Sequence, residues 1–291
     1  MAVRSLRYNT FEGRNWKGAT FATDADALAF LEAAQVYDRN QQKAIVDLVR
    51  RLKSAGLWTK MKAIYPFVGG TASSHKWNLK DPRDVDAAYR LQFNGGWTHS
   101  ANGADPNGTN AYADTYLVPN GLLTLYNSHL SYYSNESVAE VAKFPMGASS
   151  NTALFNGLEF FALRFDTNRY AAMQNAATAF PTGTMYAWAD ETSTLGYWLN
   201  SRTSSNATSL KLFKNGAAIA NATTSPANQA LNIYSLYIGA IRNLTIGSPY
   251  AANFTSARVA FATIGDGLTD TEATALYTIV DLYQKRLGRA V

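Results

Sequence analysis

One segment of the chain gathers side chains that suit contact with sugars. Between residues 97 and 112 the sequence offers aromatic rings, amides, a carboxylate and an imidazole, carried by Trp97, His99, Asn102, Asp105, Asn107, Asn110 and Tyr112. Sugars present apolar C–H faces, which stack on aromatic rings, and hydroxyl groups, which bond to amides and carboxylates. We therefore predict glycan contacts here, on a long loop over residues 95–110. The alternative is that Trp97 and Tyr112 are core anchors that flank this loop.

The sequence offers little for catalysis. A retaining glycosidase needs two carboxylates about 5 Å apart, and the Glu-x-Asp-x-Glu triplet that supplies them from one strand does not occur. A serine-type triad needs a histidine beside a nucleophile, whereas His75, His99 and His129 lie in separate segments and no Gly-x-Ser-x-Gly motif is present. We predict no catalytic residue and a protein that is not an enzyme.

One acidic cluster could hold a hard cation. Asp81, Asp84 and Asp86 form the densest group of carboxylates, and calcium takes oxygen ligands. Basic residues are interleaved with them, which favours surface ion pairs. We predict no metal site and no cofactor, with calcium as the alternative.

The composition narrows the class of protein. The chain has 291 residues, 47% of them hydrophobic and 13% aromatic, and no cysteine, so disulfides and thiolate chemistry are excluded. Aromatic residues suit half-buried strands, which predicts a mainly β fold. No apolar run approaches the ~20 residues of a membrane span, and the first residues lack a signal-peptide pattern. We expect folding in a cytoplasm, without membrane insertion and, at a dispersed net charge of +5, without nucleic-acid binding.

The N-terminal region divides into an arm and a helical hairpin. Residues 1–22 lack periodicity and predict an extended arm, whose basic residues could attach it to a particle: Arg4, Arg7, Arg14 and Lys17. The hairpin is expected over residues 23–56, with Thr23 starting its first helix, Asp38 capping its second and Gly56 ending it. The apolar linker after Gly56 predicts that the hairpin packs on the rest of the chain.

Residues 57–291 predict one sandwich that ends in a helix. Nine short apolar runs between turn residues predict strands: 63–68, 89–93, 130–134, 160–165, 184–189, 196–201, 210–214, 236–240 and 257–264. Asn215-Gly216 predicts a hairpin turn. Thr269 and Glu272 form a capping box, followed by an apolar stripe, which predicts a helix over 269–287.

Two parts of the sequence resemble two known families of proteins. The order of the hairpin at 210–216, a strand, and Ile264-Gly265-Asp266-Gly267-Leu268-Thr269-Asp270-Thr271-Glu272-Ala273 is similar to the closing section of concanavalin-A-like, laminin-G-like sandwiches. Residues 57–71, 80–82, 95–97 and 106–112 resemble structural proteins of tailed phages, particularly those that infect Bacteroidetes. The resemblance implies a concanavalin-A-like jelly-roll sandwich with an N-terminal helical hairpin and a C-terminal helix, carried on a virion.

These features lead to one expected function and two alternatives. We expect a non-enzymatic phage virion structural protein, a head decoration, head fibre or tail-associated component. It would be assembled in the host cytoplasm, attached to other virion proteins through the N-terminal arm, and homo-oligomeric. Its lectin-like sandwich could bind a cell-surface glycan. The alternatives are a free carbohydrate-binding module and a glycan-cleaving enzyme, which would require two converging carboxylates.

Overall fold

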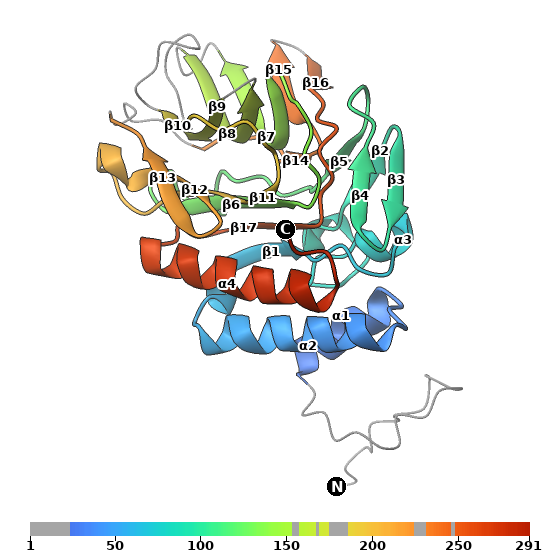
Figure 1. The fold of residues 1–291 in the computed structure, drawn as a ribbon. Coiled ribbons are helices and arrows are strands. Elements are labelled where there is room, and N and C mark those ends of the chain that lie inside the picture. The colour runs from blue at the N-terminus through green and yellow to red at the C-terminus, as the bar shows by residue number, and fades with distance from the viewer. Residues whose placement is uncertain (1–23, 153–156, 167–168, 175–185, 224–230, 246–247) are drawn as a thin grey trace, which may run out of the picture.

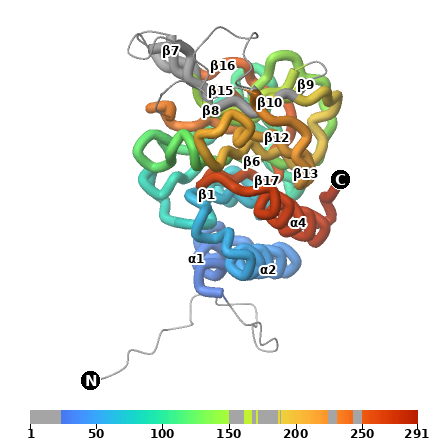
Figure 2. The backbone as a smooth tube through the Cα atoms, turned by 90° about the vertical axis from the view of Figure 1, so that its left-hand side faces the viewer, coloured from blue at the N-terminus to red at the C-terminus, as the bar shows by residue number. Residues whose placement is uncertain are grey.

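Two β-sheets pack face to face, and helices cover the outer face of one of them (Figure 1). The computed structural model describes residues 24–152, 157–166, 169–174, 186–223, 231–245 and 248–291. Seen from the side, α1 and α2 lie at one end of the molecule and the larger sheet at the other (Figure 2). The expectation of a mainly β sandwich with an N-terminal helical hairpin and a C-terminal helix is confirmed.

The smaller sheet has six antiparallel strands. Their order across the sheet is β1 (Met61–Tyr65), β17 (Phe261–Gly265), β6 (Ser128–Ser134), β11 (Gly196–Arg202), β12 (Leu210–Lys214) and β13 (Ala217–Asn221). The β12–β13 turn is the predicted one: Asn215 and Gly216 have φ values of 49° and 79°, which asparagine and glycine tolerate best. The local sequence therefore sets this hairpin.

The larger sheet has nine strands. Seven follow in the order β10 (Tyr186–Ala189), β9 (Arg169–Gln174), β8 (Gly157–Asp166), β7 (Lys143–Thr152), β14 (Tyr237–Ile238), β5 (Tyr112–Asp114) and β2 (Gln92–Asn94). The remaining pair, β15 (Ile241–Thr245) and β16 (Ser248–Ala252), joins through β15 beside β7. A separate ladder pairs β3 (Trp97–Ser100) with β4 (Gly103–Pro106).

Four of the predicted strands are shorter in the structure. The strand predicted over 63–68 ends at Tyr65, and the one predicted over 257–264 begins at Phe261. Of residues 89–93, only Gln92 and Phe93 lie in β2, because Tyr89 ends the short 3₁₀ helix η2 (Asp86–Ala88) with φ 59°. Within residues 236–240 only Tyr237 and Ile238 pair, because Gly239 has φ 89° and turns the chain towards β15. Apolar composition alone did not reveal these left-handed residues.

Two hydrophobic cores hold the layers together. The first lies between the sheets and includes Trp198, Tyr132 and Phe165, of which Trp198 and Tyr132 have no exposed surface. The second lies between the smaller sheet and the helices, where Tyr197 and Phe261 meet residues of α2 and α4. Strand alternation explains the division, because neighbours such as Tyr197 and Trp198 point to opposite faces.

The helical hairpin packs against the sandwich, as expected from the apolar linker that follows Gly56. Helix α1 (Ala25–Ala33) begins after Asp24, whose carboxylate accepts from the backbone of Asp26, so the N-cap is one residue later than expected. Helix α2 (Arg39–Ser54) begins at the predicted cap Asp38 and ends before Gly56, which has φ 70°. Its buried stripe joins the linker, the short η1 (Trp58–Lys60) and β1 in the second core.

The C-terminal helix is the most accurately predicted element. Helix α4 (Asp270–Arg286) begins with the capping box of Thr269 and Glu272, and both reciprocal hydrogen bonds are present. The helix lies along the outer face of the smaller sheet and also contacts α2 (Figure 1). Among the described helices, none is long and apolar enough to cross a membrane.

A single arginine after α4 ties four distant segments together. Arg289 is only 4% exposed and has no acidic partner among the described residues; its guanidinium instead donates to five oxygen atoms at 2.6–3.1 Å. The acceptors are the side chain of Gln284 and the backbone carbonyls of Pro66, Phe67, Ala101 and Ala260. The set of Arg289 and these acceptors is called the Arg289 network below.

We expect Arg289→Met to lower the free energy of unfolding by about 3 kcal/mol or more, because several buried carbonyls lose a charged donor at once. Urea denaturation measures this change. Arg286→Ala, at the end of α4, is the matched control, since Arg286 makes a surface ion pair with Asp47 worth at most about 1 kcal/mol. Equal effects of the two substitutions would contradict the role given to Arg289.

Candidate functional site

The predicted long loop at residues 95–110 is largely ordered as a β-ladder. Strands β3 and β4 pair within it, and β2 pairs with β5 on either side. Gly95 has φ 75°, and its neighbour Asn110 lies so close that a Cβ on Gly95 would overlap the Asn110 carbonyl. The expectation of a loop was wrong because turn-forming residues are concentrated at the corner that connects the two ladders.

Two of the predicted glycan contacts build that corner. The Asn107 Oδ1 accepts from the backbone of Thr109, Asn110 and Ala111 at 3.0–3.1 Å, and its Nδ2 donates to the Asn110 Oδ1 at 2.8 Å. The Asn110 Oδ1 also accepts from the Gly96 N–H at 3.0 Å. The amides thus satisfy backbone groups of the turn.

Two further candidates are turned towards the interior. The Trp97 Nε1 donates to the Tyr112 carbonyl at 3.2 Å, and the ring packs against Phe93 at 5.3 Å between centroids. The Nδ1 atoms of His99 and His75 are 2.9 Å apart. His75 lies at the end of the short helix α3 (Ala72–His75) and is only 1% exposed. Trp97 thus anchors the hairpin, as the alternative interpretation proposed.

The remaining candidates are separated on the surface. Asp105 pairs with Arg258 at 2.5 Å, and Asn102 is exposed, with its carbonyl accepting from Asn135 at 3.2 Å. Tyr112 lies in a separate cluster of tyrosines, described next. The attachment candidates Arg4, Arg7, Arg14 and Lys17 lie outside the described residues.

Tyrosines gather on the outer face of the larger sheet, around Tyr112. Because Tyr112, Asp114 and Tyr237 alternate with the buried Ala113 and Ile238, they share the face away from the inter-sheet core. The rings of Tyr112 and Tyr237 stack at 4.6 Å with an angle of 24°. We call this cluster the tyrosine patch: Tyr112, Asp114, Tyr116, Tyr234, Tyr237 and Arg242.

Charged groups complete the tyrosine patch. The Arg242 guanidinium lies 5.3 Å from the ring centres of both Tyr234 and Tyr237, and 3.7 Å from the Asp114 carboxylate. Asp114 also accepts from the Tyr116 N–H at 2.8 Å. Burial raises the pKa of Tyr237 to about 12, so its hydroxyl stays neutral and able to donate at neutral pH. The patch therefore combines aromatic faces with a hydrogen-bond acceptor and a cation.

Sequence reasoning found Tyr112 but not its partners. The alternation Tyr112-x-Asp114-x-Tyr116 is visible in the sequence and could have placed these three residues together. Tyr237 and Arg242 come close to Tyr112 only because β14 pairs with β5 and β15 pairs with β7. No local signal indicates that pairing.

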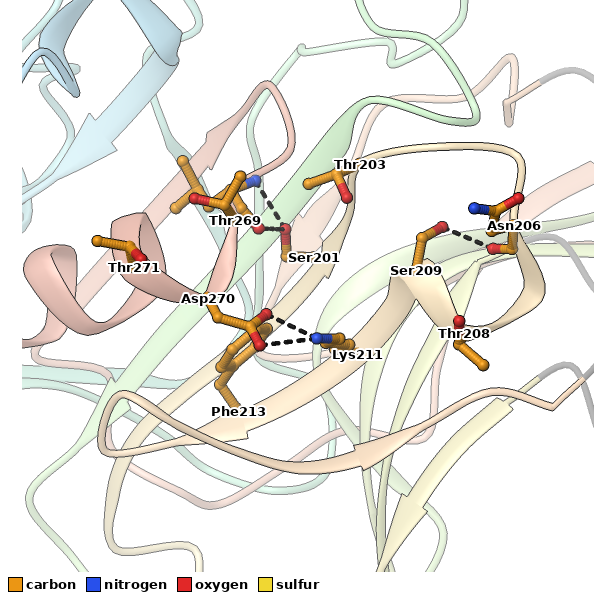
Figure 3. A pocket seen from close by; sticks show the side chains of 11 residues that line it. Ser201, Thr203, Asn206, Thr208, Ser209, Lys211, Phe213, Thr269, Asp270 and Thr271 are labelled. Atoms are coloured by element: carbon orange, nitrogen blue, oxygen red, sulfur yellow. Dashed lines mark hydrogen bonds and ion pairs between the residues drawn. The ribbon is translucent and has the colours of Figure 1, made fainter.

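A second feature is a hollow of about 390 Å³ beside the start of α4 (Figure 3). Hydroxyl groups dominate its lining, which comprises Ser201, Thr203, Asn206, Thr208, Ser209, Lys211, Phe213, Leu268, Thr269, Asp270 and Thr271. Lys211 and Asp270 form an ion pair at 2.7 Å, and Ser201 bonds to both backbone groups of Leu268 at 2.8 Å. The 3₁₀ helix η3 (Ala207–Ser209) forms part of one wall.

The acidic cluster considered for calcium is neutralised by cations. Asp81 pairs with Arg83, while Asp84 and Asp86 pair with Lys76 and Arg90, respectively. Within the described part of the chain, no group of three or more acidic, histidine or cysteine side chains is arranged to hold a metal ion. The surface ion pairs expected from the interleaved charges are present.

No protein-family model and no curated protein sequence matches the chain. Several solved structures are similar to part of the chain. Domain 4 of AbnA, a GH43 extracellular arabinanase from Geobacillus stearothermophilus in complex with arabinotriose, is 15% identical over 75% of this chain and 98% of that one, with a TM-score of 0.39. The CBM40 of the Ruminococcus gnavus IT-sialidase, bound to α2,3 sialyllactose, is 14% identical over 54% and 83%, with a TM-score of 0.36.

A third similar structure is that of botulinum neurotoxin type C, whose cell entry depends on two ganglioside molecules. It is 9% identical over 77% of this chain and 52% of that one, with a TM-score of 0.37. None of these similarities assigns a ligand or a residue role to this chain, so its function is inferred from its own side chains.

We expect the protein to lose stability as the pH falls below about 6.5. Burial lowers the pKa of His129 to about 4, and burial likewise lowers the pKa of His75 and His99. Between the two pKa values of such a histidine, the unfolded chain binds more protons than the folded chain. The free energy of unfolding is therefore highest above the pKa of the unfolded state, about 6.5, and falls as the pH approaches the pKa of the folded state. His129 alone should cost about 2 kcal/mol by pH 5.

Urea denaturation between pH 7.5 and pH 5 measures this loss. His99→Asn keeps a polar atom beside His75 and removes one titrating group. Its free energy of unfolding should therefore fall less between pH 7.5 and pH 5 than that of the natural chain. An identical pH dependence in the variant would show that the His75–His99 pair contributes nothing to acid sensitivity.

Proposed function

We propose that the protein is a non-enzymatic, glycan-binding sandwich and that it is displayed on a phage virion. The observation that carries the binding function is the tyrosine patch, in which the stacked rings of Tyr112 and Tyr237 adjoin Asp114 and Arg242. Aromatic faces stack on the C–H faces of a sugar, while carboxylate and guanidinium groups bond to its hydroxyls. The patch offers both kinds of contact within one area of the sheet surface.

The patch is also rigid enough to serve as a preformed site. Tyr237 is only 7% exposed and has Tyr112 and Arg242 against its ring, and Asp114 is fixed by the Tyr116 N–H. A ligand that binds a preformed surface loses less free energy to ordering side chains. Tyr112 and Tyr116, which are half-buried, supply the accessible aromatic surface.

Binding without cleavage is supported by the state of the nearby acids. Asp114 faces Arg242, and Asp270 beside the hollow faces Lys211. A glycosidase needs one carboxyl with a raised pKa as the acid and a second one opposite it. Each of these carboxylates has a basic group as its partner, an arrangement that supports recognition over hydrolysis.

The virion role rests on the resemblance of residues 57–71, 80–82, 95–97 and 106–112 to tailed-phage structural proteins. The geometry of the chain is compatible with it. Helix α1 begins on the helical side of the molecule, away from the larger sheet that carries the tyrosine patch (Figure 1). Attachment through the N-terminal arm would therefore leave the patch directed outwards.

We expect Tyr112→Ala to weaken glycan binding at least ten-fold, about 1.4 kcal/mol, because it removes the exposed member of the stack. A glycan array identifies a ligand, and titration calorimetry with that ligand measures the change. Tyr37→Ala is the matched control, since Tyr37 is exposed on the helical side. Undiminished binding by the Tyr112 variant, or no glycan bound by the natural chain, would contradict the proposal.

Mass spectrometry of purified phage particles tests the virion role, with the copy number measured against the major capsid protein. We expect the protein in intact particles, in many copies for a head decoration or fibre and in few copies for a tail component. Absence from particles would favour the free carbohydrate-binding module. This experiment does not depend on whether a glycan binds.

A further inference from the structure

One ion pair of the tyrosine patch is held open. The Arg242 Nη1 lies 3.7 Å from the Asp114 Oδ2, which is beyond hydrogen-bond distance, and neither group has another ion-pair partner among the described residues. Arg258 and Asp105, which are similarly half-buried, approach to 2.5 Å. The chain therefore closes one arginine–aspartate pair fully and leaves the pair in the patch open.

Separate contacts hold the two members of the open pair apart. The Arg242 Nη1 donates to the Ser235 Oγ, and the guanidinium lies 5.3 Å from the ring centre of Tyr237. The Asp114 Oδ1 accepts from the Tyr116 N–H at 2.8 Å. Each side chain is positioned by its own neighbours, so the open spacing is part of the fold of the patch.

Both groups keep unused hydrogen-bonding capacity. Within the described part of the chain, the Asp114 Oδ2 accepts no hydrogen bond, and the Arg242 Nη1 uses only one of its two N–H groups. The Arg242 Nε is buried without a partner, so the described residues satisfy this guanidinium poorly. Hydrogen bonds to charged groups are the strong ones. A ligand that supplies a donor to Asp114 and an acceptor to Arg242 therefore gains two strong contacts.

Two hydroxyl groups on neighbouring carbons of a sugar, a vicinal diol, match this pair. A hydroxyl both donates and accepts, so one donates to the Asp114 Oδ2 while its neighbour accepts from the Arg242 Nη1. An acetamido group fits less well, because its N–H and C=O point in opposite directions. An acidic group also fits less well, because it meets the like charge of the Asp114 carboxylate.

The aromatic surface of the patch lies within reach of the same sugar ring. Tyr112 and Asp114 are two residues apart on the outer face of β5, or about 7 Å at the rise of a strand. Tyr237 stacks against the Tyr112 ring at 4.6 Å and holds it in place. A pyranose ring beside Tyr112 thus places two adjacent hydroxyls at the gap between Asp114 and Arg242.

We infer that the tyrosine patch binds a neutral sugar through a free vicinal diol, with Asp114 and Arg242 as the residues that determine specificity. This inference rests on the proposed glycan-binding function and names the ligand class of the same site. A sugar in which either hydroxyl is removed or substituted binds more weakly, because one charged group is then left without its hydrogen bond.

Titration calorimetry of the full natural chain tests the inference with the methyl glycosides of glucose, galactose and mannose and with their monodeoxy derivatives at C2, C3 and C4. At least one parent glycoside should bind. Removal of either of two adjacent hydroxyls should weaken its binding at least ten-fold. Removal of the third hydroxyl should leave binding unchanged.

A variant connects the diol to its protein partner. Asp114→Asn keeps the shape of the side chain and the acceptor for Tyr116, and should weaken binding of the parent glycoside at least ten-fold. It should cause no further loss with the derivative that lacks the hydroxyl bound to Asp114, because changes to one shared contact are not additive. Asp270→Asn, in the ion pair with Lys211, is the control and should leave binding unchanged. The deoxy series needs no variant, so poor folding of Asp114→Asn would not remove the test.

Three results would overturn the inference. They are no binding of any of the three parent glycosides, dependence on a single hydroxyl or on two that are not adjacent, and an equal effect of Asp114→Asn on every sugar. Each of these leaves the proposed function intact if the glycan array detects a ligand. An array with no bound glycan would instead contradict the proposed function itself.

Discussion

The Arg289 network is the constraint on which the arrangement of the layers depends. Its guanidinium binds backbone carbonyls after β1, in the β3–β4 turn and at the entry to β17, and it binds the last turn of α4 through the side chain of Gln284. Those segments come from the smaller sheet, the hairpin and the helical layer. A planar guanidinium has five N–H donors and can satisfy five acceptors at once, whereas the ammonium group of lysine has three donors. Arg289 therefore holds these segments in place, including the β3–β4 hairpin that carries Trp97 and His99.

The aromatic residues near this network use their polar atoms for structure. Trp97 and His99 bond inwards, and His75 and His99 share a hydrogen bond between Phe67 and Phe93. A buried imidazole must remain neutral, which couples the integrity of this region to pH. The β3–β4 hairpin is thus a separate ladder fixed against the sandwich, and the tyrosine patch lies on the outer face of the larger sheet.

Polar and aromatic side chains gather at two separate places on the described surface. The tyrosine patch, on the larger sheet, offers aromatic surface beside a pair of opposite charges. The hollow beside α4 offers hydroxyl groups beside the ion pair of Lys211 and Asp270. The proposed glycan contacts belong to the tyrosine patch, because aromatic faces stack on sugars.

The sequence alone determined the elements that local chemistry controls. The caps at Asp38 and Thr269 and the Asn215-Gly216 turn each depend on residues a few positions apart, and so the pattern was sufficient. The sequence also indicated Tyr112. Only the tertiary structure decided that Tyr237 stacks on it, that Asn107 and Asn110 serve the backbone, and that Arg289 is buried among the carbonyls of distant segments. Those outcomes depend on strand pairing and burial between distant segments, which residue type and spacing do not specify.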